Sequence, residues 1–261
     1  MRFAAMAAEG ARISEDVVLG GRLVLRQPRK GHRVGHDAIL LAGACSARPG
    51  DRLVDLGAGV GAAGLAVARR VDGLAVTLVE IDADLVALAR ENAAGNKLAA
   101  RVRAICLDVA ARPAAFAAAG MAPGSADHVL MNPPFNAAAH PSPDRGRRLA
   151  HAATHGTLVQ WTGAAARLLR PAGTLTLIWR ADGLDGVLAA LAKGFGAIAI
   201  LPIHPKTDAP AIRVLVRAVK ASRAPLSLLP GLILADAAGK PSAAAEAVLR
   251  EGALLPLAEI V

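Results

Sequence analysis

Asp55-Leu-Gly-Ala-Gly-Val-Gly61 is the stretch that decides the fold of this 261-residue chain. Arg52–Leu56 has the pattern of a short buried strand, and Gly61–Arg70 is a predicted helix. Because glycine has no side chain, the turn between them can bend sharply and let a ligand approach the backbone. A strand, a glycine-rich turn and a helix in this order predict the first unit of a parallel sheet, with a ligand site at the strand's carboxyl end.

Predicted strands and helices alternate along the rest of the chain. The strands are Arg52–Leu56, Leu74–Glu80, Val102–Leu107, Asp127–Met131, Thr174–Trp179, Ala197–Ile203 and Ile212–Val219, and the helices are Gly61–Arg70, Asp84–Gly95, Leu158–Leu169 and Asp185–Ala192. This order predicts an α/β fold, a Rossmann-like doubly wound sheet of about seven strands. The loop His204–Pro210 is too short for a crossover helix, so we expect the last strand to be antiparallel, in a hairpin at a sheet edge.

The bulk composition is that of one globular unit. Hydrophobic residues make up 54% and charged residues 20%, which is enough to bury a core. We expect residues 1–50 to form a small N-terminal cap of the same domain, 51–220 the ligand-binding core, and 221–261 a C-terminal extension packed on it. No apolar run is long enough to span a bilayer or to act as a secretory signal, so we expect a cytoplasmic protein without a membrane partner. Cys45 and Cys106 are expected to be reduced core residues.

Four polar side chains stand at the ends of successive predicted strands. They are Asp55, Glu80, Asp108 and Asn132. Because the carboxyl ends of parallel strands meet at one edge of a sheet, these side chains should line one crevice, with Gly57, Gly59 and Gly61 forming its turn. Glu80 suits the two hydroxyls of a ribose, and Asp108 suits an adenine amino group.

Gly59, Gly61 and Gly64 also spell G-x-G-x-x-G, the fingerprint of dinucleotide sites. Asp55 argues against a dinucleotide, because a carboxylate ahead of the turn would repel a pyrophosphate. It suits the ammonium group of an amino acid instead. We therefore favour S-adenosyl-L-methionine (SAM) over a nicotinamide cofactor, as in an NAD(P)-dependent oxidoreductase, and over a purely structural turn.

Asn132-Pro-Pro-Phe135 is the second informative stretch. Pro133 and Pro134 fix φ and remove two backbone donors, so the segment is rigid and its carbonyl groups are free to accept. Asn132 adds an amide oxygen, and Phe135 adds a flat apolar face. Such a clamp can hold a planar heterocycle or amide that carries an NH2 group, which predicts group transfer onto that nitrogen. The alternative is a loop that merely ends a buried strand.

Basic residues outnumber acidic residues by 30 to 21, giving a net charge of +9. This excess favours a polyanionic partner, although a codon bias toward Arg and Ala could explain the charge alone. Three clusters stand out: Arg22, Arg26, Arg29, Lys30 and Arg33; Arg145, Arg147 and Arg148; and Arg213, Arg217, Lys220 and Arg223. We expect the three clusters to lie around one sheet edge and the cap.

The glycine-rich stretch, Val79-Glu80-Ile81-Asp82 and Asn132–Phe135 together resemble the class I SAM-dependent methyltransferases that modify exocyclic nitrogens. Further stretches are similar to the bacterial tRNA(Val) adenine-N6 methyltransferases: Gly20–Pro28, Gly35–Leu41, Leu168–Gly173 and Lys220–Pro225. The resemblance covers about residues 15 to 255 and implies tRNA as the substrate, methylated at the adenine next to the anticodon. Related enzymes use the same kind of tetrapeptide on protein glutamine N5 or on rRNA guanine N2, and both activities remain alternatives to a tRNA enzyme. A non-catalytic RNA-binding module is a further one.

The resemblance also implies roles for single residues. Asn132, Pro133, Pro134 and Phe135 would be catalytic: the Asn132 side chain and the Pro133 carbonyl would accept hydrogen bonds from the adenine N6, and Phe135 would stack on the base. Asp37, at a predicted helix start, would close over the methionine end of SAM or cap the helix. The RNA contacts would come from Arg29, Lys30, Arg33, Arg145, Arg147, Arg148, Arg213, Lys220 and Arg223.

Other residues are expected to be structural. Asp82 should cap a helix, and Trp161 and Trp179 should lie in the core. The histidines of the 140–155 region, His140, His151 and His155, have no partners at ligand spacing, so no metal is expected. The sequence leaves open whether the protein is a monomer or a homodimer.

Overall fold

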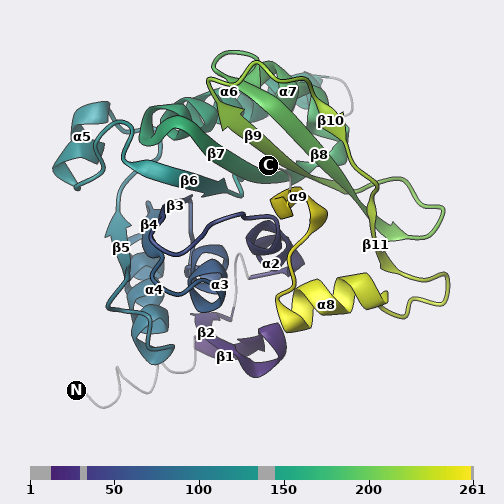
Figure 1. Ribbon diagram of the computed structural model, residues 1–261, viewed down its shortest axis with the longest axis horizontal. Coiled ribbons are helices and arrows are strands. Elements are labelled where there is room, and N and C mark those ends of the chain that lie inside the picture. Colours follow the sequence, from purple (N-terminus) through teal and green to yellow (C-terminus); the bar gives the residue numbers. More distant parts are fainter. Residues whose placement is uncertain (1–12, 30–33, 135–144, 260–261) are drawn as a thin grey trace.

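A central sheet organises the structure, a computed structural model that describes residues 13–29, 34–134 and 145–259, with the backbone alone at 145–155 (Figure 1). Its strands are β3 (Arg52–Leu56), β4 (Ala75–Glu80), β5 (Val102–Cys106), β6 (Ala126–Met131), β7 (Leu169–Arg180), β8 (Phe195–Lys206), β9 (Arg213–Lys220), β10 (Ser227–Leu228) and β11 (Leu232–Ala235). Within the described ranges the strand order is β10-β8-β9-β7-β6-β3-β4-β5, and β11 also pairs with β8. β1 (Ile13–Val18) and β2 (Leu23–Pro28) form a separate antiparallel hairpin.

The predicted doubly wound α/β fold is confirmed, with two corrections at the sheet's end. β9 is antiparallel to both of its neighbours, as the short loop required, but it lies between β7 and β8 and not at the edge. The hairpin folds back so that its second strand reaches β7 first, which leaves β8 outside. β10 and β11, from the C-terminal extension, then pair parallel to β8, so the sheet gains two strands beyond the seven expected.

Helices cover both faces of the sheet (Figure 1). One face carries α2 (His36–Gly43), α3 (Ala62–Arg70), α4 (Ala83–Gly95), α8 (Ala243–Glu251) and α9 (Pro256–Glu259), and the other carries α5 (Pro113–Ala118), α6 (Arg145–Leu168) and α7 (Leu184–Leu191). Successive residues on a strand therefore face different cores: Leu53 packs into the first and Val54 into the second. Such double burial explains why these strands are continuous apolar runs. Among the described residues, we find no helix with the length and apolarity needed to cross a membrane.

The N-terminal hairpin is held on α4 by two asparagines one helical turn apart. Asn96 Oδ1 accepts from the Val24 N–H at 3.0 Å, and Asn92 Oδ1 accepts from the Arg26 N–H at 2.7 Å. Each side-chain amide also donates back to the carbonyl of the same residue. The two amides thus take the place of a neighbouring strand along the outer edge of β2, which satisfies backbone groups that would otherwise lack partners.

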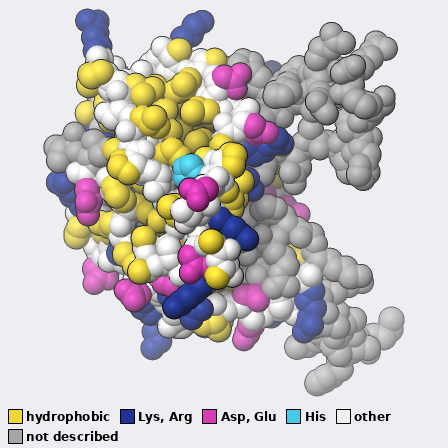
Figure 2. Space-filling view, turned by 90° about the vertical axis from the view of Figure 1, so that its right-hand side faces the viewer, with side chains coloured by type: hydrophobic (Ala, Val, Ile, Leu, Met, Phe, Trp, Pro, Cys, Tyr) yellow, Lys and Arg dark blue, Asp and Glu magenta, His cyan; other side chains and the backbone are white. Residues whose placement is uncertain are grey.

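The C-terminal extension lies on the right-hand side of the molecule in Figure 1. Figure 2 shows this side, where apolar side chains gather over the region of β10 and β11. Leu226, Leu228 and Ile233 are exposed there. The residues between Ala224 and Ala235 include no charged side chain, which accounts for the apolar character of this surface.

The sequence predicted that both cysteines and Trp179 are buried, and the structure confirms this for two of the three. Cys45 and Trp179 are buried as predicted, and burial raises the pKa of the Cys45 thiol to about 11. Cys106 is free but exposed, so its assignment to the core was wrong. It ends β5, an edge strand that pairs with β4 on one side and with no described strand on the other.

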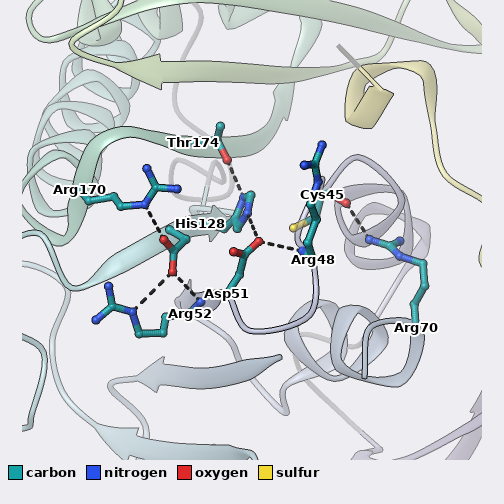
Figure 3. A network of polar contacts seen from close by, with 9 residues as sticks. Cys45, Arg48, Asp51, Arg52, Arg70, His128, Arg170 and Thr174 are labelled. Atoms are coloured by element: carbon teal, nitrogen blue, oxygen red, sulfur yellow. Dashed lines mark hydrogen bonds and ion pairs between the residues drawn. The ribbon is translucent and has the colours of Figure 1, made fainter. Parts of the chain in front are cut away.

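A buried polar network ties the strands together at their amino ends (Figure 3). The ring of His128, on β6, contacts Thr174 of β7 through Nδ1 at 2.6 Å and Asp51 through Nε2 at 3.0 Å. Asp127 bonds Arg170 at 2.5 Å nearby. Burial lowers the pKa of His128 from its ordinary value of 6.5, against the opposing effect of its hydrogen bond to Asp51. The neutral ring can donate through Nε2–H to Asp51 and accept at Nδ1 from Thr174, so both nitrogens have partners without a second proton on the ring.

We predict that this network makes stability fall in mild acid. The pKa of His128 is lower in the folded than in the unfolded chain, so the unfolded state binds the proton more tightly, and stability is lost as pH falls below about 6.5. Urea unfolding between pH 7.5 and 5 should show a steeper loss for the wild type than for His128→Gln. Parallel pH curves for the two proteins would contradict this assignment.

Candidate functional site

The glycine-rich turn connects β3 to α3 through three residues with left-handed backbone. The φ angles are 68° at Gly57, 56° at Gly59 and 92° at Gly61. A Cβ on Gly57 would lie 2.3 Å from the ring of Trp161, whereas a Cβ on Gly59 would meet nothing within 4 Å. Gly57 is therefore required for packing, and Gly59 leaves open space where a ligand can reach the backbone.

Asp55 is the last residue but one of β3 and lies beneath this turn. Its side chain is buried, and Oδ2 accepts from the Gly64 N–H of α3 at 2.9 Å. Burial, together with the nearby charge of Glu80, raises the pKa of Asp55 from 3.8 to about 7, against the opposing effect of the Gly64 hydrogen bond. Near neutral pH this carboxyl is thus poised between its two protonation states.

Glu80 holds the turn from the end of the next strand. Its Oε2 accepts from the Gly59 N–H at 2.8 Å, and its Oε1 accepts from the N–H groups of Ile81 at 2.8 Å and Asp82 at 3.0 Å. Asp82 is the N-cap of α4, as predicted, and accepts from Asp84 and Leu85. Glu80 therefore fixes both the glycine turn and the chain that leaves β4.

Two adjoining cavities lie over the carboxyl ends of the strands. The larger, of about 430 Å³, is lined by Asp37, Asp55, Arg213 and the segment Val34–Ala38, and the smaller, of about 290 Å³, by Glu80, Asp108, Pro133, Pro134 and Trp161. Gly57, Gly59, Leu85 and Asn132 line both. The structure thus brings together the side chains that the strand ends predicted. Asp108 is exposed to the cavity, with Oδ1 bonded to the Ala110 N–H at 2.8 Å.

Gly61 is an exception among the predicted cofactor residues, because it lines neither cavity. It precedes α3 as its N-cap, and a Cβ there would approach Leu78 to 2.8 Å. Its need for glycine comes from packing against β4 and from its positive φ.

Asn132 follows directly after β6 and presents an unpaired acceptor. Its Oδ1 is buried and has no hydrogen-bond partner among the described residues. Leaving a buried acceptor unpaired costs about 1–3 kcal/mol, and native proteins rarely do so without a functional reason. Since Asn132 lines both cavities, this oxygen is available to a donor on a bound ligand. Pro133 is buried and Pro134 exposed beside it, and Phe135 lies outside the described residues.

Asp37 and Arg213 form an ion pair in the wall of the larger cavity. Arg213 Nε donates to Asp37 Oδ2 at 2.9 Å, and each side chain is 26% exposed. Asp37 stands in the first turn of α2, whose N-cap is Gly35, so the alternative role of Asp37 as a helix cap was wrong. Arg213 contributes to the cavity that was expected to bind the cofactor, a position that its membership of a basic cluster did not indicate.

The basic clusters do not surround one edge of the sheet as expected. β9 is antiparallel, so Arg213 lies at the cavity end, whereas Lys220 and Arg223 lie at the other end, about 23 Å along the strand. Lys220 donates to the Leu169 carbonyl at 2.5 Å, and Arg29 donates to the Ile13 carbonyl at 3.0 Å.

The other predicted RNA contacts cannot be placed. Lys30 and Arg33 lie outside the described residues, and only the backbone is described at Arg145, Arg147 and Arg148. His140 also lies outside the described residues. In the part of the chain that the structure describes, no group of three or more His, Cys, Asp or Glu residues is arranged to hold a metal ion.

Trp161 is the cavity residue that sequence reasoning missed. It was expected in the core, but it is only partly buried, and its ring packs on Gly57 and lines the smaller cavity. A single aromatic residue in a long amphipathic helix gives no sign of which end of the sheet it will reach.

A doubly wound sheet with an inserted antiparallel strand, and acidic residues around a glycine turn at its carboxyl edge, define a class I methyltransferase, whose methyl donor is SAM. The family described as Methyltransferase small domain matches residues 32–207, and the chain belongs to this family. The cavities suit SAM: Gly59 leaves backbone accessible, and the oxygens of Glu80 and Asp108 border the smaller cavity as hydrogen-bond acceptors.

Individual relatives agree with this family. The chain is 29% identical over 169 residues to the tRNA1(Val) (adenine(37)-N6)-methyltransferase of Tolumonas auensis, covering 64% of this chain and 68% of that protein. It is 27% identical over 197 residues to the protein of the same name from Dyadobacter fermentans, covering 75% and 79%. The crystal structure of a predicted O-methyltransferase from Agrobacterium tumefaciens superposes with a TM-score of 0.72 at 30% identity, covering 84% of this chain and 98% of that one.

We predict that cofactor binding strengthens as pH rises through 7. The pKa of Asp55 is about 7, and its ionised form attracts the ammonium group of a bound amino acid, whereas its protonated form does not. Titration calorimetry with S-adenosylhomocysteine should show affinity falling by up to about tenfold per pH unit below 7. Asp55→Asn should bind weakly at every pH, and an unchanged pH dependence in this variant would exclude Asp55 as the source.

Proposed function

We propose that the protein methylates the exocyclic N6 of an adenine in tRNA. The single observation that carries this proposal is the unpaired Oδ1 of Asn132, because a buried amide oxygen beside the cofactor cavity selects a substrate with an N–H donor. The names of the Tolumonas and Dyadobacter relatives supply the substrate class. By the same relationship, the target is the adenine next to the anticodon of tRNA(Val), and the enzyme acts in the cytoplasm, where tRNA is modified.

Cofactor binding would rest on the acidic strand ends. Asp55 and Asp37 border the larger cavity, which suits the amino-acid end of SAM, and Arg213 fixes the position of Asp37. Glu80 and Asp108 border the smaller cavity, where their oxygens can accept from ribose hydroxyls and from the adenine amino group. The cavities meet at Gly57, Gly59 and Asn132, so the two ends of one extended ligand would both pass the glycine turn.

Bound SAM supplies an activated methyl group on a sulfonium, so neither a metal ion nor a general base is required. Asn132 Oδ1 and the Pro133 carbonyl would accept the two N–H bonds of the adenine amino group. These bonds favour a more tetrahedral nitrogen, whose lone pair is less delocalised into the ring, and orient it for in-line attack. The amide oxygen only accepts a hydrogen bond, so the proton lost from nitrogen passes to water.

Transfer assays with radiolabelled SAM test the substrate. Purified protein should label tRNA, and nucleoside analysis of that tRNA should reveal N6-methyladenosine. Ribosomal RNA and release-factor protein, offered separately, distinguish guanine-N2 and glutamine-N5 methylation. Label that enters protein alone, or rRNA alone, would reject the tRNA proposal while leaving the methyltransferase family intact.

We predict that Asn132→Ala lowers the transfer rate by about 100-fold, the usual cost of losing one polar group that stabilises the reacting centre. Affinity for S-adenosylhomocysteine should change less than about threefold, because this oxygen accepts no hydrogen bond from the described residues and its loss breaks no contact within the cofactor cavity. Asp108→Asn serves as a control with the opposite expectation: it should lower the affinity for S-adenosylhomocysteine more than it lowers the transfer rate at saturating SAM. Equal losses of binding and transfer in Asn132→Ala would contradict the role assigned to this residue.

A further inference from the structure

Asn92, on α4, joins two parts of the chain that are far apart in sequence. It is 2% exposed, and its side-chain oxygen accepts from the Arg26 N–H at 2.7 Å. Its Nδ2 donates to the Arg26 carbonyl at 3.0 Å and to the Val60 carbonyl at 3.0 Å. Both protons of the amide and its oxygen are therefore used, and one partner lies on the N-terminal hairpin while the other lies on the glycine turn.

The Val60 carbonyl belongs to the part of the turn with the least inherent rigidity. Val60 lies between Gly59 and Gly61, which both have positive φ, and it lines the larger cavity. Glycine loses more conformational freedom than any other residue when its backbone is fixed, so such a turn needs anchors. Glu80 supplies an anchor through the Gly59 N–H, and Asn92 supplies one through the adjacent carbonyl.

The hairpin partner of Asn92 leads to the facing wall of the same cavity. Arg26 is followed by Gln27, a buried side chain whose Oε1 accepts from the Val34 N–H at 2.8 Å. Val34 begins the segment Val34–Ala38, which lines the larger cavity and contains Asp37. Through Arg26 on one side and Val60 on the other, a single amide thus connects both walls of the cofactor cavity.

We propose that Asn92 is a positioning residue for the cofactor: it fixes the glycine turn and the Val34–Asp37 wall at the spacing the cofactor requires. Without its Nδ2 donor, the buried Val60 carbonyl loses its partner, and the turn is free to adopt other backbone conformations that binding must then reorder. This inference concerns cofactor binding alone and holds whichever nucleophile accepts the methyl group.

Asn96 provides a matched control one helical turn away. It is 6% exposed and grips β2 in the same manner, accepting from the Val24 N–H at 3.0 Å and donating to the Val24 carbonyl at 2.7 Å. Its second donated bond goes to the Asn92 carbonyl within α4 at 2.7 Å. Asn96→Ala therefore removes a buried amide and an anchor of the hairpin and leaves the bond to the glycine turn in place.

We predict that Asn92→Ala weakens binding of S-adenosylhomocysteine about tenfold, the equivalent of one hydrogen bond of ordinary strength, whereas Asn96→Ala changes it less than about twofold. Titration calorimetry measures the affinities, and thermal unfolding measures the stability of both variants. The proposal would be overturned if both variants lost affinity in proportion to their loss of melting temperature, since that result would indicate a purely structural role for Asn92.

Amide hydrogen exchange distinguishes the proposed role from general destabilisation, because it reports on the hairpin and on the glycine turn separately. In ligand-free protein, exchange of residues 22–28 should accelerate in both variants, but exchange of residues 57–64 should accelerate in Asn92→Ala alone. Adding S-adenosylhomocysteine to the wild type should protect both segments, and in Asn92→Ala it should protect the hairpin less.

Should Asn92→Ala not fold, Asn92→Asp keeps the acceptor for Arg26 and removes both donors. Unchanged exchange at 57–64 in the variant that folds would refute the proposal.

Discussion

Two buried carboxylates beneath a turn of glycines are the constraint on which the rest of the structure depends. Asp55 and Glu80 come from neighbouring strands and accept N–H groups of Gly64 and Gly59. Burial disfavours the ionised form of Asp55, the nearby charge of Glu80 adds to this effect, and the raised pKa of Asp55 records that cost. A cationic ligand bound above them relieves it. The strand ends therefore hold the turn in shape and at the same time select the charge of what binds there.

Much of the fold could be predicted because local signals agree with the tertiary structure. β3 covers Arg52–Leu56 as predicted, and α4 begins after the N-cap Asp82. A short apolar run favours a strand and a capping carboxylate favours a helix start by themselves, and the folded chain keeps both local preferences. The crevice was predictable for a topological reason. Parallel strands place their carboxyl ends together, so Asp55, Glu80 and Asn132 had to meet at one edge.

The remainder depended on contacts that sequence does not carry. Trp161 lines a cavity because α6 presents one side of its last turns to Gly57, and the pairing of Asp37 with Arg213 spans 176 positions. A seven-residue loop indicates that β8 and β9 are antiparallel, but not that β9 is the strand that pairs with β7. The partners of Asn92 were equally hidden, because a buried asparagine in a helix resembles any polar residue on a solvent-facing side.

The position of β9 has a consequence for how the chain is made. Strands β3 to β7 are complete by residue 180, but β7 gains its second neighbour only when residues 213–220 are available. A chain still being synthesised therefore holds a sheet in which β7 pairs with β6 on one side only, and the free N–H and C=O groups on its other side can pair with any extended peptide nearby. Since β8 is synthesised before β9, correct folding also requires that β8 does not pair with β7, because β9 pairs there in the folded protein. During synthesis, β7 can therefore pair wrongly before β9 has been made. When the full chain refolds, β9 is present from the start and can compete for this position.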